Sequence, residues 1–179
     1  MTAKNQSTRI ILLTGDGKGK TSSALGMALR AAGHGLRVCA IQFIKQPCDT
    51  GEARALRLLP GVTLHTCGNG FVLPSDTSDA HGKHCAAAAA GLALAQAALN
   101  DPQTEMVLLD EICGAVTLGL LPLQAVLDAL HTAAPGKIII LTGRAAPQAL
   151  IDLADTVSIV HAQKHAFDTH RPAQPGVEF

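Results

Sequence analysis

A turn rich in glycine and lysine, TGDGKGKTS at residues 14–22, carries the residues of this chain whose types and spacing best suit chemistry. An apolar run precedes the turn at residues 10–13, and a helix-like stretch follows it at residues 23–30. In a turn between a strand and a helix, backbone N–H groups and the positive end of the helix dipole converge on one point. The turn therefore predicts a binding site for an anion such as phosphate.

The turn matches the end of the phosphate-loop pattern GxxxxGK[ST] but not its beginning, because Thr14 stands where a glycine is usual. Loop N–H groups would cradle phosphate oxygens, Lys20 would add a point charge, and the Thr21 hydroxyl would ligate Mg²⁺. We expect Gly15 and Gly17 to keep the backbone open for phosphate, and the Lys20 ammonium to be solvated in the nucleotide-free protein. The alternative is a merely tight turn between a strand and a helix.

Charged residues follow two further apolar runs. Asp110 and Glu111 end the run MVLLDE, and a buried strand that delivers a carboxylate beside a phosphate loop can hold Mg²⁺ or orient water. Their alternative role is to cap the following helix, whose positive end attracts acids. Arg144 follows the run at residues 138–141, where its guanidinium can clamp a phosphate or a substrate amide or carboxylate, or simply face water.

The remaining candidate metal ligands do not predict a metal centre. His81, His84 and Cys85 form an HxxHC cluster, but the rest of the sequence offers no ligands at comparable spacing, so we expect these side chains to bind no zinc. The chain has five cysteines and no CxxC pair, which argues against both a disulfide framework and a zinc ribbon. We expect the cysteines to be reduced thiols.

The composition favours one domain that binds small molecules. With 179 residues, of which 47% are hydrophobic, the chain can bury one sizeable core but is short for two. Its formal net charge of +0 gives no electrostatic reason to expect binding to nucleic acid or to an anionic membrane. No apolar stretch approaches the ~20 residues of a membrane span, and the N-terminus does not resemble a signal peptide. We therefore expect a cytoplasmic protein.

Short apolar runs alternate with helical patterns along the chain. Because they are runs rather than alternations, we expect strands with both faces covered. The runs predict strands at residues 9–13, 38–44, 62–65, 106–109, 138–141 and 157–160. Apolar spacing and the positions of Gly and Pro predict helices at residues 21–32, 76–99, 122–131 and 147–154. This order predicts an α/β fold with a doubly wound, mostly parallel sheet and helices on both faces.

Three stretches fall outside this alternation. Residues 45–51 and 68–75 are dense in Gly, Pro, Asn and Asp, which predicts loops. Both follow strands, where the ligand loops of open α/β sheets lie. Residues 164–179 have no periodicity and predict an irregular C-terminal arm. We expect residues 1–179 to form a single nucleotide-binding domain that includes this arm.

Several segments together resemble the P-loop ATP:corrinoid adenosyltransferases, which act on cob(I)alamin or cob(I)yrinic acid a,c-diamide. They are GDGKGKTS, VLLDEI, LTGR, LADTVS and KHAFD, in this order and over nearly the whole chain, with QFIK, GE, GF and a final GVEF in support. The resemblance implies a P-loop NTPase-like (RecA-like) fold. It also implies transfer of the 5′-deoxyadenosyl group of MgATP to a Co(I) corrinoid, with release of triphosphate.

The resemblance also implies roles for individual residues. Lys20 and Arg144 would be catalytic, and Mg²⁺ would be bound by Thr21 and Glu111, with Asp110 as a further candidate ligand. The corrinoid would contact Phe71 and Leu73. The triphosphate of ATP would be held by the loop residues Gly15, Asp16, Gly17, Lys18, Gly19, Lys20, Thr21 and Ser22.

The sequence departs from the family pattern at three of its motifs. Leu73 replaces an aromatic side chain, Cys113 replaces an asparagine, and Ile159 stands where a glutamate is frequent. These departures bear on the choice of corrinoid and on cobalt activation more than on ATP binding. The resemblance further implies an electron donor for cobalt and a homodimer. The alternatives are a non-catalytic corrinoid carrier and a P-loop ATPase or kinase that acts on another small molecule.

Overall fold

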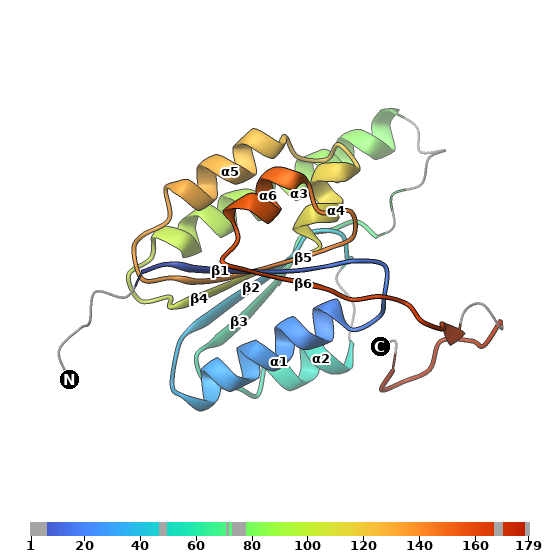
Figure 1. Cartoon of the computed structure of the whole chain (residues 1–179), viewed down its shortest axis with the longest axis horizontal. Helices are drawn as coiled ribbons and strands as arrows, with labels where there is room; N and C mark the ends of the chain where they lie inside the picture. Colours follow the sequence, from blue (N-terminus) through green and yellow to red (C-terminus); the bar gives the residue numbers. More distant parts are fainter. Residues whose placement is uncertain (1–6, 47–49, 71, 73–77, 167–169, 178–179) are drawn as a thin grey trace.

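The computed structural model describes residues 7–46, 50–70, 72, 78–166 and 170–177. Within these residues, six parallel strands form one sheet in the order β3-β2-β4-β5-β1-β6 (Figure 1). The strands are β1 (Arg9–Thr14), β2 (Val38–Gln42), β3 (Val62–Thr66), β4 (Met106–Asp110), β5 (Ile138–Thr142) and β6 (Thr156–Ile159). Because all strands are parallel, the loops that follow them meet at one edge of the sheet.

Helices cover both faces of the sheet, as a doubly wound fold requires. In Figure 1, α1 and α2 lie on one face, and α3, α4, α5 and α6 lie on the other. The helices are α1 (Lys20–Gly33), α2 (Gly51–Leu56), α3 (Ser78–Asn100), α4 (Ile112–Thr117), α5 (Leu123–His131) and α6 (Gln148–Leu153). The predicted fold class is confirmed.

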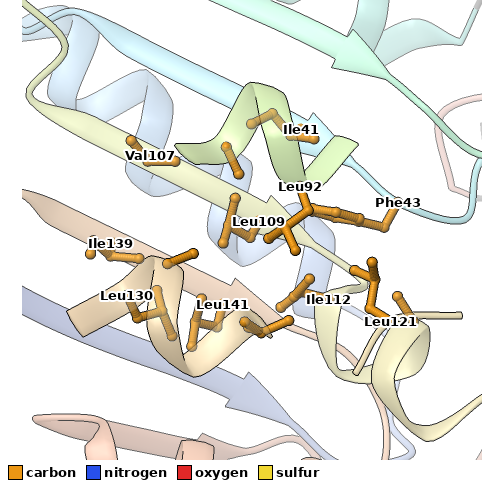
Figure 2. Packing of buried hydrophobic residues seen from close by; sticks show 14 of the residues in the cluster. Ile41, Phe43, Leu92, Val107, Leu109, Ile112, Leu121, Leu130, Ile139 and Leu141 are labelled. Carbon is orange, nitrogen blue, oxygen red and sulfur yellow. The ribbon is translucent and has the colours of Figure 1, made fainter. Parts of the chain in front are cut away.

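The main hydrophobic core lies between the sheet and the helices of the α3 face. Figure 2 shows Leu92 of α3 next to Phe43 and to Leu109 of β4, and Leu130 of α5 next to Ile139 and Leu141 of β5. A second cluster packs α1 on the opposite face through three buried alanines. Every residue of β2 and β4 is buried, which explains why these strands read as continuous apolar runs.

The structure differs from the sequence-based expectation in two short helices and one strand. The helices α2 and α4 have six residues each and neither was predicted. Such a length is too short for a helical period to be recognised, and neither helix has the preceding proline that indicated the equally short α6. Strand β6 is exposed at all four positions, so it is not covered as expected. It lies at the edge of the sheet, where it pairs only with β1 among the described strands.

The end of the chain leaves the sheet after β6. Residues 164–166 and 170–177 contain no α-helix or β-strand. Among the described residues, no helix combines the length and apolar character needed to cross a bilayer.

Candidate active site

The phosphate-loop glycines are required by close backbone packing. The loop joins β1 to α1, and Gly15 and Gly19 have φ values of 99° and 115°, which favour glycine. A Cβ atom on Gly15 would lie 2.5 Å from the carbonyl oxygen of Val160, and one on Gly17 would lie 2.8 Å from that of His161. Gly17 also donates its N–H to Val160, at 2.8 Å. The segment after β6 therefore holds the loop, a constraint that the sequence did not indicate.

The Lys20 side chain lies inside the loop and is only 6% exposed, so the expectation of a solvated ammonium was wrong. Its Nζ donates to the carbonyl oxygens of Gly15 and Gly17, at 2.7 and 2.8 Å. Burial lowers the pKa of Lys20; the nearby Glu111 carboxylate opposes this change, and the Arg144 charge adds to it. The backbone of the loop thus fixes the lysine charge where phosphate would bind.

The carboxylate of Asp110 is the centre of a buried hydrogen-bond network. It is 1% exposed and lies at the end of β4. Its Oδ1 atom accepts from the hydroxyls of Thr21 and Thr142, at 2.8 and 2.7 Å, and its Oδ2 atom accepts from Nε2 of Gln42, at 3.1 Å. Thr66 in turn donates to Oε1 of Gln42, at 3.4 Å. The network joins the loop helix α1 to β2, β3, β4 and β5.

Gln42 and Thr142 were not recognised from the sequence as site residues. Gln42 is the in-register neighbour of Asp110, and Thr142 ends β5, which lies between β4 and the loop strand β1. The available signal was a polar residue at the end of an otherwise apolar run in each case. It became informative only when the sheet order was known.

Glu111 lies in a strained and partly buried position next to this network. Its φ of 61° is in the left-handed region, which costs a non-glycine residue roughly 1–3 kcal/mol. Its N–H donates to the Thr142 hydroxyl at 2.9 Å. Burial raises the pKa of Glu111, with the Asp110 charge acting in the same direction and Lys20 and Arg144 in the opposite one. Glu111 is the N-cap residue of α4, but its side chain makes no capping hydrogen bond. This observation does not support the alternative that Glu111 serves to cap the helix.

The side chains of Thr21, Asp110 and Glu111 together offer hard oxygen donors. Thr21 gives its proton to Asp110, so the lone pairs of its hydroxyl oxygen remain free for a cation. Asp110 already accepts three hydrogen bonds, which suits a residue that orients Thr21 better than a direct metal ligand. Within the described ranges, no three His, Cys, Asp or Glu side chains gather as a metal site, at His81 and His84 included. The oxygen donor set fits Mg²⁺ completed by phosphate and water.

The remaining predicted site residues are distributed as follows. Arg144 is exposed in the loop after β5, and its charge acts on both Lys20 and Glu111. Asp16, Lys18 and Ser22 are exposed in the phosphate loop or the first turn of α1. The two predicted corrinoid contacts, Phe71 and Leu73, lie outside the described residues.

The Cys113 thiol is buried next to the site and is expected to be unreactive. It is 0% exposed, and burial, together with the Glu111 charge, raises its pKa to about 12. Because the thiolate is the nucleophile, Cys113 should escape alkylation by iodoacetamide at pH 8, while the half-buried Cys85 reacts faster. Peptide mass spectrometry with and without denaturant measures both rates. Equal alkylation of Cys113 in folded and denatured protein would contradict this expectation.

Comparisons with known proteins agree over almost the whole chain. Residues 6–179 match the family described as ATP:corrinoid adenosyltransferase BtuR/CobO/CobP. The corrinoid adenosyltransferase CobA of Salmonella typhimurium is 39% identical over 95% of this chain and 85% of its own length. The corrinoid adenosyltransferases of Pseudomonas aeruginosa and Escherichia coli K12 are 39% and 37% identical, over 99% of this chain and 86% and 88% of their own lengths. The chain belongs to the ATP:corrinoid adenosyltransferase family.

Proposed function

We propose that this chain transfers the 5′-deoxyadenosyl group of MgATP to a Co(I) corrinoid and releases triphosphate. The electron pair of Co(I) forms the bond to C5′ as the bond between C5′ and the triphosphate oxygen breaks. The observation that carries the proposal is the hydrogen bond from Thr21 to Asp110 at 2.8 Å, beside the buried Lys20, in a chain of this family. That arrangement unites a phosphate loop with an acidic strand, as ATP binding requires.

The protein groups have an electrostatic and orienting role in this proposal. The nucleophile is the reduced cobalt of the substrate, so no general base is required. Lys20 and Arg144 neutralise charge on the departing triphosphate, and the loop backbone fixes its position. Thr21 and Glu111 hold Mg²⁺, with Asp110 orienting Thr21; when bound, the ion supplies further charge stabilisation. The exposed loop residues Asp16, Lys18 and Ser22 complete the triphosphate site.

The corrinoid is proposed to lie at the loop after β3, against Phe71 and Leu73. The start of this loop is held firmly to the chain after β2. Gly70 donates its N–H to the Ile44 carbonyl at 3.0 Å, and a Cβ on Gly68 would lie 2.0 Å from that same oxygen. This contact supports a substrate loop that begins at the edge of the sheet occupied by Asp110 and Lys20.

Four further features belong to the proposal. Residues 1–179 act as one domain, and an electron donor reduces the cobalt before transfer. The reaction takes place in the cytoplasm, where MgATP is abundant and the thiols stay reduced. Two copies form a homodimer, as the resemblance to the family implies; light scattering of the purified chain tests this point.

Product analysis with MgATP and chemically reduced cobalamin tests the proposed reaction. We expect one triphosphate for each adenosylated corrinoid formed, measured by ³¹P NMR and by the corrinoid absorption spectrum. Formation of ADP would instead indicate an ATPase or kinase. Binding of corrinoid and MgATP without turnover would indicate a carrier.

A further inference from the structure

The residue that breaks the phosphate-loop pattern makes a contact that glycine cannot make. Thr14 ends β1 and is 5% exposed. Its hydroxyl oxygen accepts a hydrogen bond from the backbone N–H of Ala146 at 3.3 Å, across 132 residues of sequence. Glycine, the usual residue at this position, has no side-chain acceptor. Thr14 therefore links the beginning of the phosphate loop to the loop that follows β5.

The loop after β5 is anchored to β1 on both sides of Arg144. On one side, Gly143 donates its N–H to the Leu13 carbonyl at 3.2 Å. On the other side, Ala146 donates to the Thr14 hydroxyl at 3.3 Å. Between the anchors, Ala145 has a φ of 48°, a left-handed conformation that is unfavourable for alanine. A loop with this conformation needs contacts that hold it in place.

Arg144 itself depends on this backbone for its position. Its side chain is exposed, and within the described part of the chain its guanidinium makes no hydrogen bond or ion pair. The preceding residue, Gly143, packs on the start of α4, since a Cβ there would lie 2.9 Å from the Gly114 nitrogen, so the loop carries Arg144 close to Glu111. In agreement, the Arg144 charge acts on both Lys20 and Glu111. An arginine on a mobile loop loses more conformational entropy on binding phosphate than an arginine whose loop backbone is already fixed.

We propose that Thr14 is a positioning residue that fixes the loop of residues 143–146 so that Arg144 reaches the triphosphate. This inference rests on the proposed function, because it assumes that Arg144 contacts the triphosphate of ATP. Thr14 itself touches neither substrate. The threonine at the first position of the loop is thus a functional substitution, since it couples two loops that both bind the same anion.

Isothermal titration with Mg²⁺ and inorganic tripolyphosphate measures this role apart from catalysis. Thr14→Val keeps the shape of the side chain but removes the acceptor, and we expect affinity to fall about 3- to 10-fold, the range for one hydrogen bond. Thr14→Ser keeps the hydroxyl and should restore most of the affinity. Thr14→Ala provides a second variant without an acceptor if valine impairs folding.

A control residue lies on β3, the strand at the opposite edge of the sheet from β1 and β6. The hydroxyl of Thr63 in β3 also bonds to the backbone at 3.3 Å, but as a donor, to the Val38 carbonyl. Thr63 is exposed whereas Thr14 is buried, but Thr63→Val removes a strand hydroxyl that is bonded at the same distance, and it should leave tripolyphosphate affinity unchanged. An equal loss of affinity in the Thr63 and Thr14 variants would overturn the inference, because it would show a general effect on stability.

A double-mutant cycle tests whether Thr14 acts through Arg144. In an Arg144→Ala background, Thr14→Val should change affinity by less than about 2-fold, since coupled residues are not additive. Full additivity, or normal affinity of Thr14→Val alone, would overturn the inference while leaving the proposed function intact. Failure of the unsubstituted protein to bind tripolyphosphate would overturn both.

Discussion

Lys20→Ala is expected to abolish adenosyl transfer. The substitution removes a preorganised charge from the proposed triphosphate site, which corresponds to about 2–4 kcal/mol of transition-state stabilisation. It also removes the donor to the Gly15 and Gly17 carbonyls, so the free energy of unfolding should fall by about 1–3 kcal/mol. Single-turnover adenosylation of reduced cobalamin and denaturant unfolding measure the two effects separately.

Lys137, just before β5, offers a control with the same kind of side-chain contacts away from the phosphate loop. Its side chain is 4% exposed and its Nζ donates to the backbone carbonyls of Asp101 and Thr104. Burial lowers the pKa of Lys137, as it does for Lys20. Lys137→Ala should therefore cost similar stability but leave MgATP affinity unchanged. Adenosylation by Lys20→Ala at the rate of the Lys137 variant would refute the assignment of the phosphate loop.

The fold was largely predictable because hydrophobic periodicity reflects burial. Strands β2 and β4 are buried on both faces, and a strand in that environment must be apolar at successive positions. The helix α3 was equally clear from its length and from the sequence Asn100, Asp101 and Pro102 at its C-terminal end. The short helix α4 was missed because its first four residues are all buried, so it shows no amphipathic pattern.

The candidate site was predictable only where the chemistry lies within one short motif. Lys20, Thr21, Asp110 and Glu111 could be selected because phosphate loops and acidic strand ends have recognisable sequences. The groups that hold them come from distant segments. Gln42 lies 68 residues from Asp110 in sequence, and their contact depends on the pairing of β2 with β4. Such register is set by the whole sheet, so it cannot be read from either segment alone.

Asp110→Asn is expected to have the second large effect, a higher Mg²⁺ requirement for adenosyl transfer. The cause is the lost charge rather than lost hydrogen bonds. An amide can keep much of the network if its nitrogen takes the place of Oδ2. The Gln42 amide would then rotate to present Oε1 to the new donor, and the Thr66 hydroxyl would accept from Gln42 Nε2. Thr21 and Thr142 would still donate to the remaining oxygen. The folded structure should therefore persist.

The charge beside Thr21 has no such replacement. Loss of a residue that orients a metal ligand typically weakens metal affinity about 10- to 100-fold, and we expect this range for the Mg²⁺ requirement of Asp110→Asn. The dependence of adenosylation rate on Mg²⁺ concentration at saturating ATP measures the change. The midpoint temperature of thermal unfolding, measured without nucleotide, should change little by comparison.

A second substitution moves the carboxylate from β4 to β2. It tests whether Mg²⁺ binding needs the negative charge at Thr21 or only a negative charge somewhere in the network. In the double variant Gln42→Glu with Asp110→Asn, the new glutamate accepts from the asparagine amide, so the pair keeps its hydrogen bond and its net charge. If Mg²⁺ binding needs the charge at Thr21, the double variant should remain as defective as Asp110→Asn. If it instead recovers normal Mg²⁺ dependence, a negative charge anywhere in the network suffices. The assignment of Asp110 as the partner that orients Thr21 would then be wrong.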